Sequence, residues 1–431
     1  MRRTPFIILA ISVSVRVSVF LWQALHPLPF NPTLQNFEDF SIYYLKELAL
    51  LSQGYLPYRD FPYSYPPLFL YVLAPFYRLG SNAAAIPIIL ADALSAPLVY
   101  LILRRNSTET LAIVASIAYV VSPFFVVYEG LSWLSEQPML FSLLLCVYLL
   151  LEGRIALSSA AFAIALLFKQ DAIFMFPAFA YWAIRLYGAR SLALGIGIVA
   201  GVVGIVSLPF LILAPVGYLY SLTLGHLFPN FHPLMSLPSS SGVIFASGFT
   251  ATNATLPNLT CSYLVNNPLQ ISQVCTGVEA NGSTLTNWLG GVPAETSGLL
   301  RLITMLLLVP LIPEIALLKK VKHVNLSLTA CVGAVLALLV FGGYLIPYKY
   351  YFVPYYALLL VSGTTGLSVA TAILAPVVTL AMPSYTPVTA ATNLISTSII
   401  SLVALHFVVG FEFLRSRSAA RTDGGRDRIG S

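Results

Sequence analysis

Residues 191–214 read SLALGIGIVAGVVGIVSLPFLILA, a stretch with no Asp, Glu, Lys, Arg or His. About 20 consecutive apolar residues form a helix long enough to cross the hydrocarbon core of a bilayer. We therefore predict a transmembrane helix here. Similar apolar stretches recur on both sides of it along the chain.

The composition of the whole chain supports the same interpretation. Of the 431 residues, 58% are hydrophobic and 9% are charged, and the mean hydropathy is +0.86. A soluble globular protein has about 25% charged residues. Because lipid-facing surface needs no charges, an integral membrane protein is the natural solution. The net charge of +6 is dispersed between the apolar stretches without a basic face, so no nucleic-acid partner is predicted.

The fold class predicted is all-α, a polytopic transmembrane helix bundle of about 12 spans, with 11–13 compatible with the pattern. The candidate spans are 5–25, 83–103, 109–127, 137–152, 156–169, 171–187, 191–214, 299–318, 325–346, 350–367, 368–382 and 388–413. Several are short, and 156–187 could be a re-entrant pair. The first resembles a signal peptide in outline, but it is too long and lacks a cleavage site, so we expect a retained span.

Charge determines how the ambiguous stretch 65–80 is interpreted. It is apolar but short and contains three prolines, so it could be a span or an interfacial helix. As an interfacial helix, it leaves 15 of the 22 Lys and Arg residues on the cytoplasmic side and 6 outside, with Arg16 within the first span. Cytoplasmic loops retain Lys and Arg, so both termini are predicted to be cytoplasmic.

This topology divides the chain into a transmembrane domain, 1–414, and a polar tail, 415–431, predicted to be disordered. Two large external loops follow, loop one at 26–82 and loop two at 217–298. Loop two is polar and contains Cys261 and Cys275, which could form a disulfide outside the cytoplasm. It also contains three sequons, which are possible glycosylation sites, at Asn253, Asn258 and Asn281.

Loop one contains an unusual concentration of acidic residues. Acidic residues number only 16 in the chain, yet Glu38, Asp39, Glu47 and Asp60 all fall in this loop. Carboxylates beside a membrane are costly to bury, so they usually have a function or are exposed to solvent. Asp39 could alternatively be a helix N-cap, and Asp60 could serve a turn in Pro57-Tyr58-Arg59-Asp60-Phe61-Pro62.

Five segments resemble the GT-C class of integral membrane glycosyltransferases, mannosyltransferases among them. The acidic pair Glu38-Asp39 follows the first span, and Tyr65-Pro66-Pro67-Leu68 comes after it. Weaker similarities are Ser135-Glu136-Gln137-Pro138, Leu167-Phe168-Lys169-Gln170, and Tyr348-Lys349-Tyr350-Tyr351. The pair is Glu-Asp rather than Asp-x-Asp, and the soluble C-terminal domain of some relatives of that class is absent.

The resemblance implies transfer of a sugar, such as the hexose mannose, from a polyprenyl- or dolichyl-phosphate carrier. The acceptor would be a lipid, a glycan or a protein on the extracytoplasmic face. Asp39 is the expected base that deprotonates the acceptor hydroxyl, with Glu38 as the alternative. The expected substrate-binding residues are Arg59, Asp60, Tyr65, Glu136, Lys169, Lys349 and Tyr350, since Lys and Arg are the usual phosphate partners.

Simpler roles stand beside these expectations. Lys349 could snorkel at the membrane interface, Glu136 could complement a helix dipole, and Lys169 could pair with Asp171. The sequence predicts no specific metal ligands, although some enzymes of this class need Mg²⁺ or Mn²⁺. A multispan transporter or lipid-glycan flippase is the alternative function, but the paired repeats typical of transporters are missing.

Overall fold

The computed structural model describes residues 3–26, 40, 44–61, 63, 65–219, 222, 259–267, 270–277, 349–381, 399–401, 403–411 and 414. The fold is the predicted all-α bundle. The predicted spans 299–318 and 325–346, the three sequons and the tail 415–431 lie outside the described residues.

The first half of the bundle supplies most of the described helices. In chain order these are α1 Thr4–Leu25, α2 Leu45–Ser52, α3 Pro67–Tyr77, the 3-10 turn η2 Asn82–Ala85, α4 Ile86–Arg104, α5 Glu109–Val121, α6 Pro123–Phe125, the π-helix η3 Val126–Leu131, α7 Glu136–Leu151, α8 Ile155–Phe168, the 3-10 turn η4 Gln170–Met175, α9 Phe176–Tyr187, α10 Ala189–Leu213 and α11 Pro215–Leu219. Later elements are η10 Lys349–Phe352, α17 Val353–Ser362, α18 Gly366–Ala381 and a helix at Ile399–Phe411.

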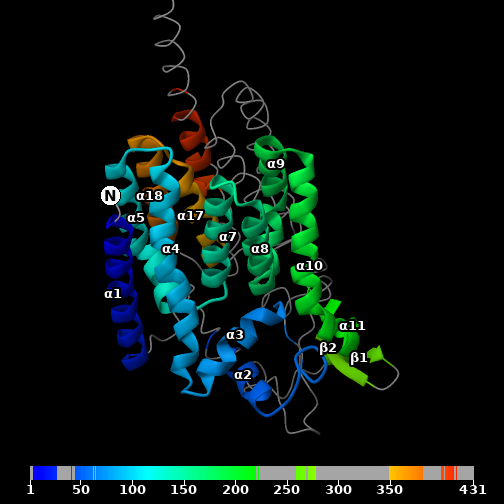
Figure 1. The fold of residues 1–431 in the computed structure, drawn as a ribbon. Coiled ribbons are helices and arrows are strands. Elements are labelled where there is room, and N and C mark those ends of the chain that lie inside the picture. The colour runs from blue at the N-terminus through cyan, green and yellow to red at the C-terminus, as the bar shows by residue number, and fades with distance from the viewer. Residues whose placement is uncertain are drawn as a thin grey trace, which may run out of the picture.

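Two ends of the bundle can be distinguished in Figure 1. Helix α1 begins at the end marked N and runs to the opposite end, where α2, α3 and α11 lie. Helices α4, α7, α8 and α10 pack in sequence beside one another. The helices of loop one and the start of loop two therefore share one end of the bundle, opposite the N-terminus.

Three described helices are long and apolar enough to cross a membrane alone: Thr4–Leu25, Asn82–Arg104 and Ala189–Leu213. A fourth span is possible if Glu109–Val121 and Pro123–Leu131 count together, bent by 42°. Pro123 explains the break, because proline lacks the N–H that continues a helix. These apolar helices agree with an integral membrane protein, while the total of about 12 spans stays a prediction.

Several other predicted spans, among those that the structure describes, form shorter helices. Helix α7 has 16 residues, α8 has 14 and α9 has 12. Helix α3, within the ambiguous stretch 65–80, has 11 residues, which extend about 16 Å at 1.5 Å per residue. That is roughly half of a 30 Å hydrocarbon core, which is compatible with an interfacial helix, and this assignment stays a prediction.

Loop one folds against the bundle through its own aromatic core. Buried side chains from α2, the following turn and α3 pack with Trp133 and with the end of α10. The buried aromatic residues of this core are Phe40, Tyr44, Tyr58, Phe61, Tyr63, Phe69, Trp133, Phe210 and Tyr218. Edge-to-face contacts such as Tyr58–Tyr218, with ring centroids 4.9 Å apart, give this loop a fixed position.

Loop two contains a hairpin that the sequence did not predict. Strands β1, Leu259–Asn267, and β2, Gln270–Gly277, pair antiparallel. Their register places Cys261 opposite Cys275. Directly paired positions are the closest in a hairpin, and this backbone register is compatible with the predicted disulfide, which stays a prediction.

Close packing between α8 and α10 leads to a first prediction. A Cβ at Gly195 would lie 2.8 Å from Ser159 Oγ, whereas a Cβ at Gly201 would meet nothing within 4 Å. We expect Gly195→Ala to destabilise the purified protein by about 1–3 kcal/mol through overpacking. Gly201→Ala is the control and should not lower the thermal unfolding temperature. Equal stability of the two variants would contradict the packing described here.

Candidate active site

Lys169 occupies a break between two helices. Helix α8 ends at Phe168, and Lys169 adopts an extended conformation, with φ −154° and ψ 129°, before η4 begins. Its side chain is 3% exposed. A lysine is almost never buried without partners, so its surroundings define a polar site.

Two carboxylates surround the Lys169 ammonium. It forms an ion pair with Glu136 and lies 3.4 Å from an Asp171 carboxylate oxygen. Glu136 is the first residue of α7 and is itself 1% exposed. With all three groups ionised the set has one excess negative charge. The predicted pairing of Lys169 with Asp171 is therefore present, and Glu136 joins it.

Aromatic rings complete the surroundings of Lys169. Its Nζ lies 4.5 Å from the ring centroid of Tyr351, 5.6 Å from that of Tyr350 and 5.7 Å from that of Tyr65. A cation within about 6 Å of an aromatic face is attracted by the ring quadrupole. Four distant parts of the chain, at residues 65, 136, 169–171 and 350–351, thus meet at one point. We call this set the Lys169 site.

Loop one is connected directly to the Lys169 site. Tyr44 Oη donates to Tyr65 Oη at 3.4 Å, and the Tyr58 hydroxyl donates to the backbone carbonyl of Tyr65. Tyr58 has φ +67°, a left-handed conformation that a bulky residue rarely adopts. Such backbone strain persists only where surrounding contacts enforce it, here to hold Tyr65.

Arg59 and Asp60 form a pair of their own at the turn. Arg59 Nη2 and Nε lie 2.7 Å and 2.8 Å from the Asp60 carboxylate, which also accepts from the Leu56 N–H at 2.7 Å. The turn role expected for Asp60 is therefore realised. Both side chains are partly exposed, 29% and 23%.

Lys349 adjoins the site but points elsewhere. Its Nζ donates to the carbonyl of Leu380, in the last turn of α18, at 3.2 Å. Burial lowers the pKa of Lys349 to about 8, so the amine is still mainly protonated at pH 7. Tyr350, its neighbour in η10, faces Lys169 instead.

The expected catalytic pair, Glu38 and Asp39, lies outside the described residues. Phe40, directly after Asp39, is described: it is 5% exposed and packs edge-on against Trp133 with centroids 5.0 Å apart. Trp133 precedes Glu136 by three residues. The chain position next to the acidic pair is therefore anchored close to the segment that leads into α7.

Sequence reasoning assigned no role to four residues that the structure places in polar or aromatic surroundings. Tyr351 has the ring nearest to Lys169, although only its neighbour Tyr350 was expected in the site. Glu47 of α2 is 3% exposed among the aromatic residues of loop one, and the concentration of four of the chain's 16 acidic residues in this loop was the available signal. For Arg16 and Glu129, which are buried in the bundle, nothing in the sequence beyond their charge indicated a role.

Chemically, the Lys169 site combines an ammonium and tyrosine rings with two carboxylates that offset the positive charge. The ammonium can attract phosphate oxygens, and tyrosine faces suit the apolar face of a sugar. Among the described residues, no group of three or more His, Cys, Asp or Glu side chains is placed to hold a metal ion.

The fold and the Lys169 site thus define an integral membrane protein with a polar, aromatic-lined site at one end of its bundle. Over residues 64–213 the chain matches the family described as dolichyl-phosphate-mannose-protein mannosyltransferase. This match spans about a third of the chain and includes Tyr65, Glu136 and Lys169. It confirms the resemblance to GT-C mannosyltransferases and supports, in general, a glycosyltransferase that uses mannose on a polyprenyl phosphate. No curated protein matches the chain.

Proposed function

We propose that this protein is a membrane glycosyltransferase that moves mannose from a polyprenyl-phosphate carrier to a lipid, glycan or protein acceptor on the extracytoplasmic face. The observation that carries the proposal is the convergence at Lys169 of Tyr65, Glu136 and Tyr350, side chains from distant parts of the chain. Three of these four residues lie within the segment matched by the mannosyltransferase family.

The proposed face rests on charge. Loop one and the start of loop two share one end of the bundle, and the Lys169 site lies where loop one packs against it. The Lys and Arg excess assigns the opposite end, with the N-terminus, to the cytoplasm. The site would therefore be extracytoplasmic.

The proposed reaction is a single displacement with inversion. Asp39, or alternatively Glu38, accepts the proton of the acceptor hydroxyl. The hydroxyl oxygen then forms a bond to the sugar C1 as the bond between C1 and the phosphate oxygen breaks. The phosphate leaves with the electron pair, and Lys169 offsets its charge, with Arg59 and Lys349 as further cations.

An apolar cavity gives the carrier chain a place to lie. A cavity of about 640 Å³ opens between α3, α4, α7 and α8, and every side chain of its lining is apolar except Ser142. The lining runs along α7 from Pro138 to Leu149, about 17 Å of helix. It includes Phe168, adjacent to Lys169 in the chain. We propose that the isoprene units occupy this cavity while the phosphate reaches Lys169.

The direct test uses full-length protein in lipid nanodiscs with radiolabelled donors. Dolichyl-phosphate mannose is offered beside dolichyl-phosphate glucose, with a lipid extract, a lipid-linked glycan and a Ser/Thr-rich peptide as acceptors. Label should reach one acceptor class from the mannose donor. Absence of transfer from every donor would refute the proposal, and donor lipid crossing the bilayer in vesicles would favour the flippase alternative.

Filling the cavity supplies a second test. Ala160 lines it, whereas Ala156, one turn earlier on α8, is exposed and outside the lining. We expect Ala160→Phe to raise the KM for a long-chain donor about tenfold, because the ring displaces an isoprene unit from the apolar cavity. KM for a donor with a two-isoprene chain should change less. Ala156→Phe is the matched control and should leave both values unchanged.

If Ala160→Phe affected both donors equally, or neither, the carrier chain would not lie in this cavity.

A further inference from the structure

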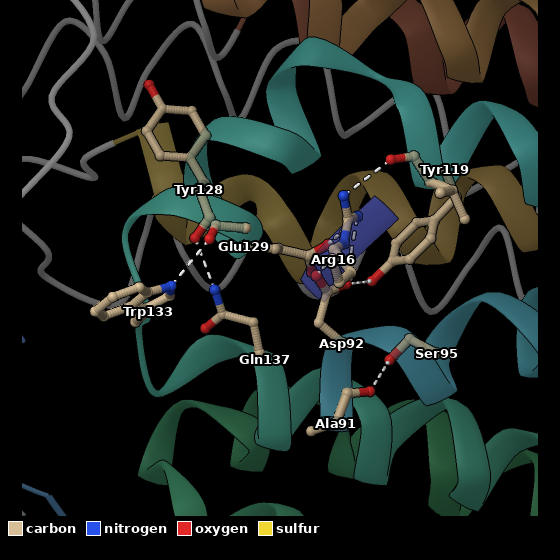
Figure 2. Close-up of polar contacts among 11 residues, drawn as sticks. Arg16, Ala91, Asp92, Ser95, Tyr119, Tyr128, Glu129, Trp133 and Gln137 are labelled. Atoms are coloured by element: carbon tan, nitrogen blue, oxygen red, sulfur yellow. Dashed lines mark hydrogen bonds and ion pairs between the residues drawn. The ribbon is translucent and has the colours of Figure 1, made fainter. Parts of the chain in front are cut away.

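A charged cluster is buried in the middle of the bundle, apart from the Lys169 site (Figure 2). Arg16 lies midway along α1, Asp92 on α4, Tyr119 on α5 and Glu129 on η3. The side chains of Arg16, Asp92 and Glu129 are at most 1% exposed. Ionisable groups inside a membrane protein are expensive and usually functional.

Asp92 is the primary partner of Arg16. The two form an ion pair, and Tyr119 Oη donates to Asp92 Oδ1 at 3.0 Å. Arg16 is therefore the partner that a buried Asp92 needs inside the bundle. One ion pair would already neutralise Arg16, so the second buried carboxylate, Glu129 at 3.9 Å from Nη2, needs a separate explanation.

The cluster lies at the break between α5 and η3. Arg16 Nη1 donates to the carbonyl of Val120 at 2.9 Å, three residues before the Pro123 that interrupts the helix. Glu129 then extends from the π-helix Val126–Leu131 toward the same guanidinium. One arginine thus contacts the chain on both sides of the 42° bend. Single π-helical turns are rare and frequently found at functional sites.

The segment after Glu129 leads directly to Glu136. Trp133 has φ +47°, and its Nε1 donates to the Gly130 carbonyl at 3.0 Å. Gln137 Nε2 donates to the Tyr128 carbonyl at 2.7 Å, so the start of α7 is bonded back to the same π-helix, as Figure 2 shows. A Cβ at Gly130 would lie 3.0 Å from Val19 Cγ1 of α1. The π-helix therefore lies tightly between α1 and α7.

We propose that Glu129 is a positioning residue for Glu136. Its contact with Arg16 fixes the π-helix, and the bonds of Trp133 and Gln137 transmit that position to the Glu136 carboxylate beside Lys169. The proposal rests on the glycosyltransferase function for its activity readout. Its structural readout, the environment of Trp133, is independent of any reaction.

Glu129→Gln is the test variant, because it replaces the carboxyl group and keeps the shape of the side chain. Glu109→Gln is the matched control: Glu109 opens α5 and accepts from Thr4 and Tyr100, bonds that a glutamine carbonyl can also accept. Full-length protein carries 5-fluorotryptophan at its four Trp positions, and Trp133→Phe identifies the Trp133 signal. In ¹⁹F NMR spectra, Glu129→Gln should shift that signal and Glu109→Gln should not.

The second measurement is the rate of sugar transfer by each variant. Misplacement of a group by about 1 Å can reduce a rate 100-fold, so kcat of Glu129→Gln should fall on the order of 10–100-fold with little change in KM. Adding Glu129→Gln to Glu136→Gln should cause no further loss, because groups that act through one another are not additive. If Glu129→Gln does not fold, Tyr119→Phe replaces it as the test variant. Tyr119→Phe keeps every charge and should shift the same Trp133 signal.

The positioning role would be overturned if the Trp133 signal did not move in folded Glu129→Gln. The same holds for Tyr119→Phe if that variant has to replace Glu129→Gln. Full kcat with a shifted signal, or additive losses in the double variant, would also overturn it. If the wild-type protein transfers no sugar from any donor, the proposed function fails. The ¹⁹F spectra then decide the positioning role alone, a shift supporting it and an unmoved signal refuting it.

Discussion

Asp39→Asn is expected to abolish sugar transfer. Asparagine cannot accept the proton of the acceptor hydroxyl, and general-base catalysis contributes about 10²–10⁴-fold to a rate. We expect kcat to fall by that factor while KM for the donor changes little, as measured with dolichyl-phosphate mannose in nanodiscs. Asp39 lies outside the described residues, and the kinetic result decides its role.

Two variants make the Asp39 result specific. Glu38→Gln should reduce kcat less than Asp39→Asn, because Asp39 is the proposed base and Glu38 the alternative. Glu109→Gln, at the far end of the bundle, should retain wild-type kcat. If Asp39→Asn were active and Glu38→Gln inactive, the roles of the two acids would be exchanged. If both were active, the base would lie elsewhere.

Lys169→Met is expected to damage both stability and activity. It leaves Glu136 and Asp171 buried beside each other without their cation. Removing one partner of a buried ion pair costs about 3–5 kcal/mol, and the methionine cannot attract the carrier phosphate. Thermal unfolding in detergent should report the loss of stability, and transfer should be undetectable.

A double variant separates the two effects of Lys169. Lys169→Met with Glu136→Gln removes one carboxylate together with the cation and should recover much of the lost stability. Transfer should stay absent, because the cation for the leaving phosphate is still missing. Recovery of transfer with stability would mean that Lys169 serves only the fold.

The Lys169 site could be predicted in part from the sequence. Four residues of the site occur in segments of unusual composition, in which a polar residue stands beside Pro or Tyr in apolar sequence: Tyr65, Glu136, Lys169 and Tyr350. Each was expected to bind substrate. Their meeting point could not be predicted. Residues 65 and 350 are brought together by tertiary packing, on which local sequence patterns carry no information.

The least predictable contacts involve side-chain direction. Lys349 and Tyr350 are adjacent, yet one bonds the end of α18 and the other faces Lys169. The Arg16–Asp92 pair spans 76 positions, and only the cost of an unpaired charge indicated that Asp92 needed a partner. The continuous apolar stretches, in contrast, are local features, and they predicted the all-α bundle correctly.

The short helices around the Lys169 site have a consequence for the surrounding lipid. At 16 and 14 residues, α7 and α8 extend about 24 Å and 21 Å, less than the roughly 30 Å of a typical hydrocarbon core. A bilayer adapts to such hydrophobic mismatch by thinning locally. Beside these helices the lipid head groups would dip toward the bundle, so a carrier diffusing in the membrane would bring its phosphate to the depth of the site without leaving the leaflet.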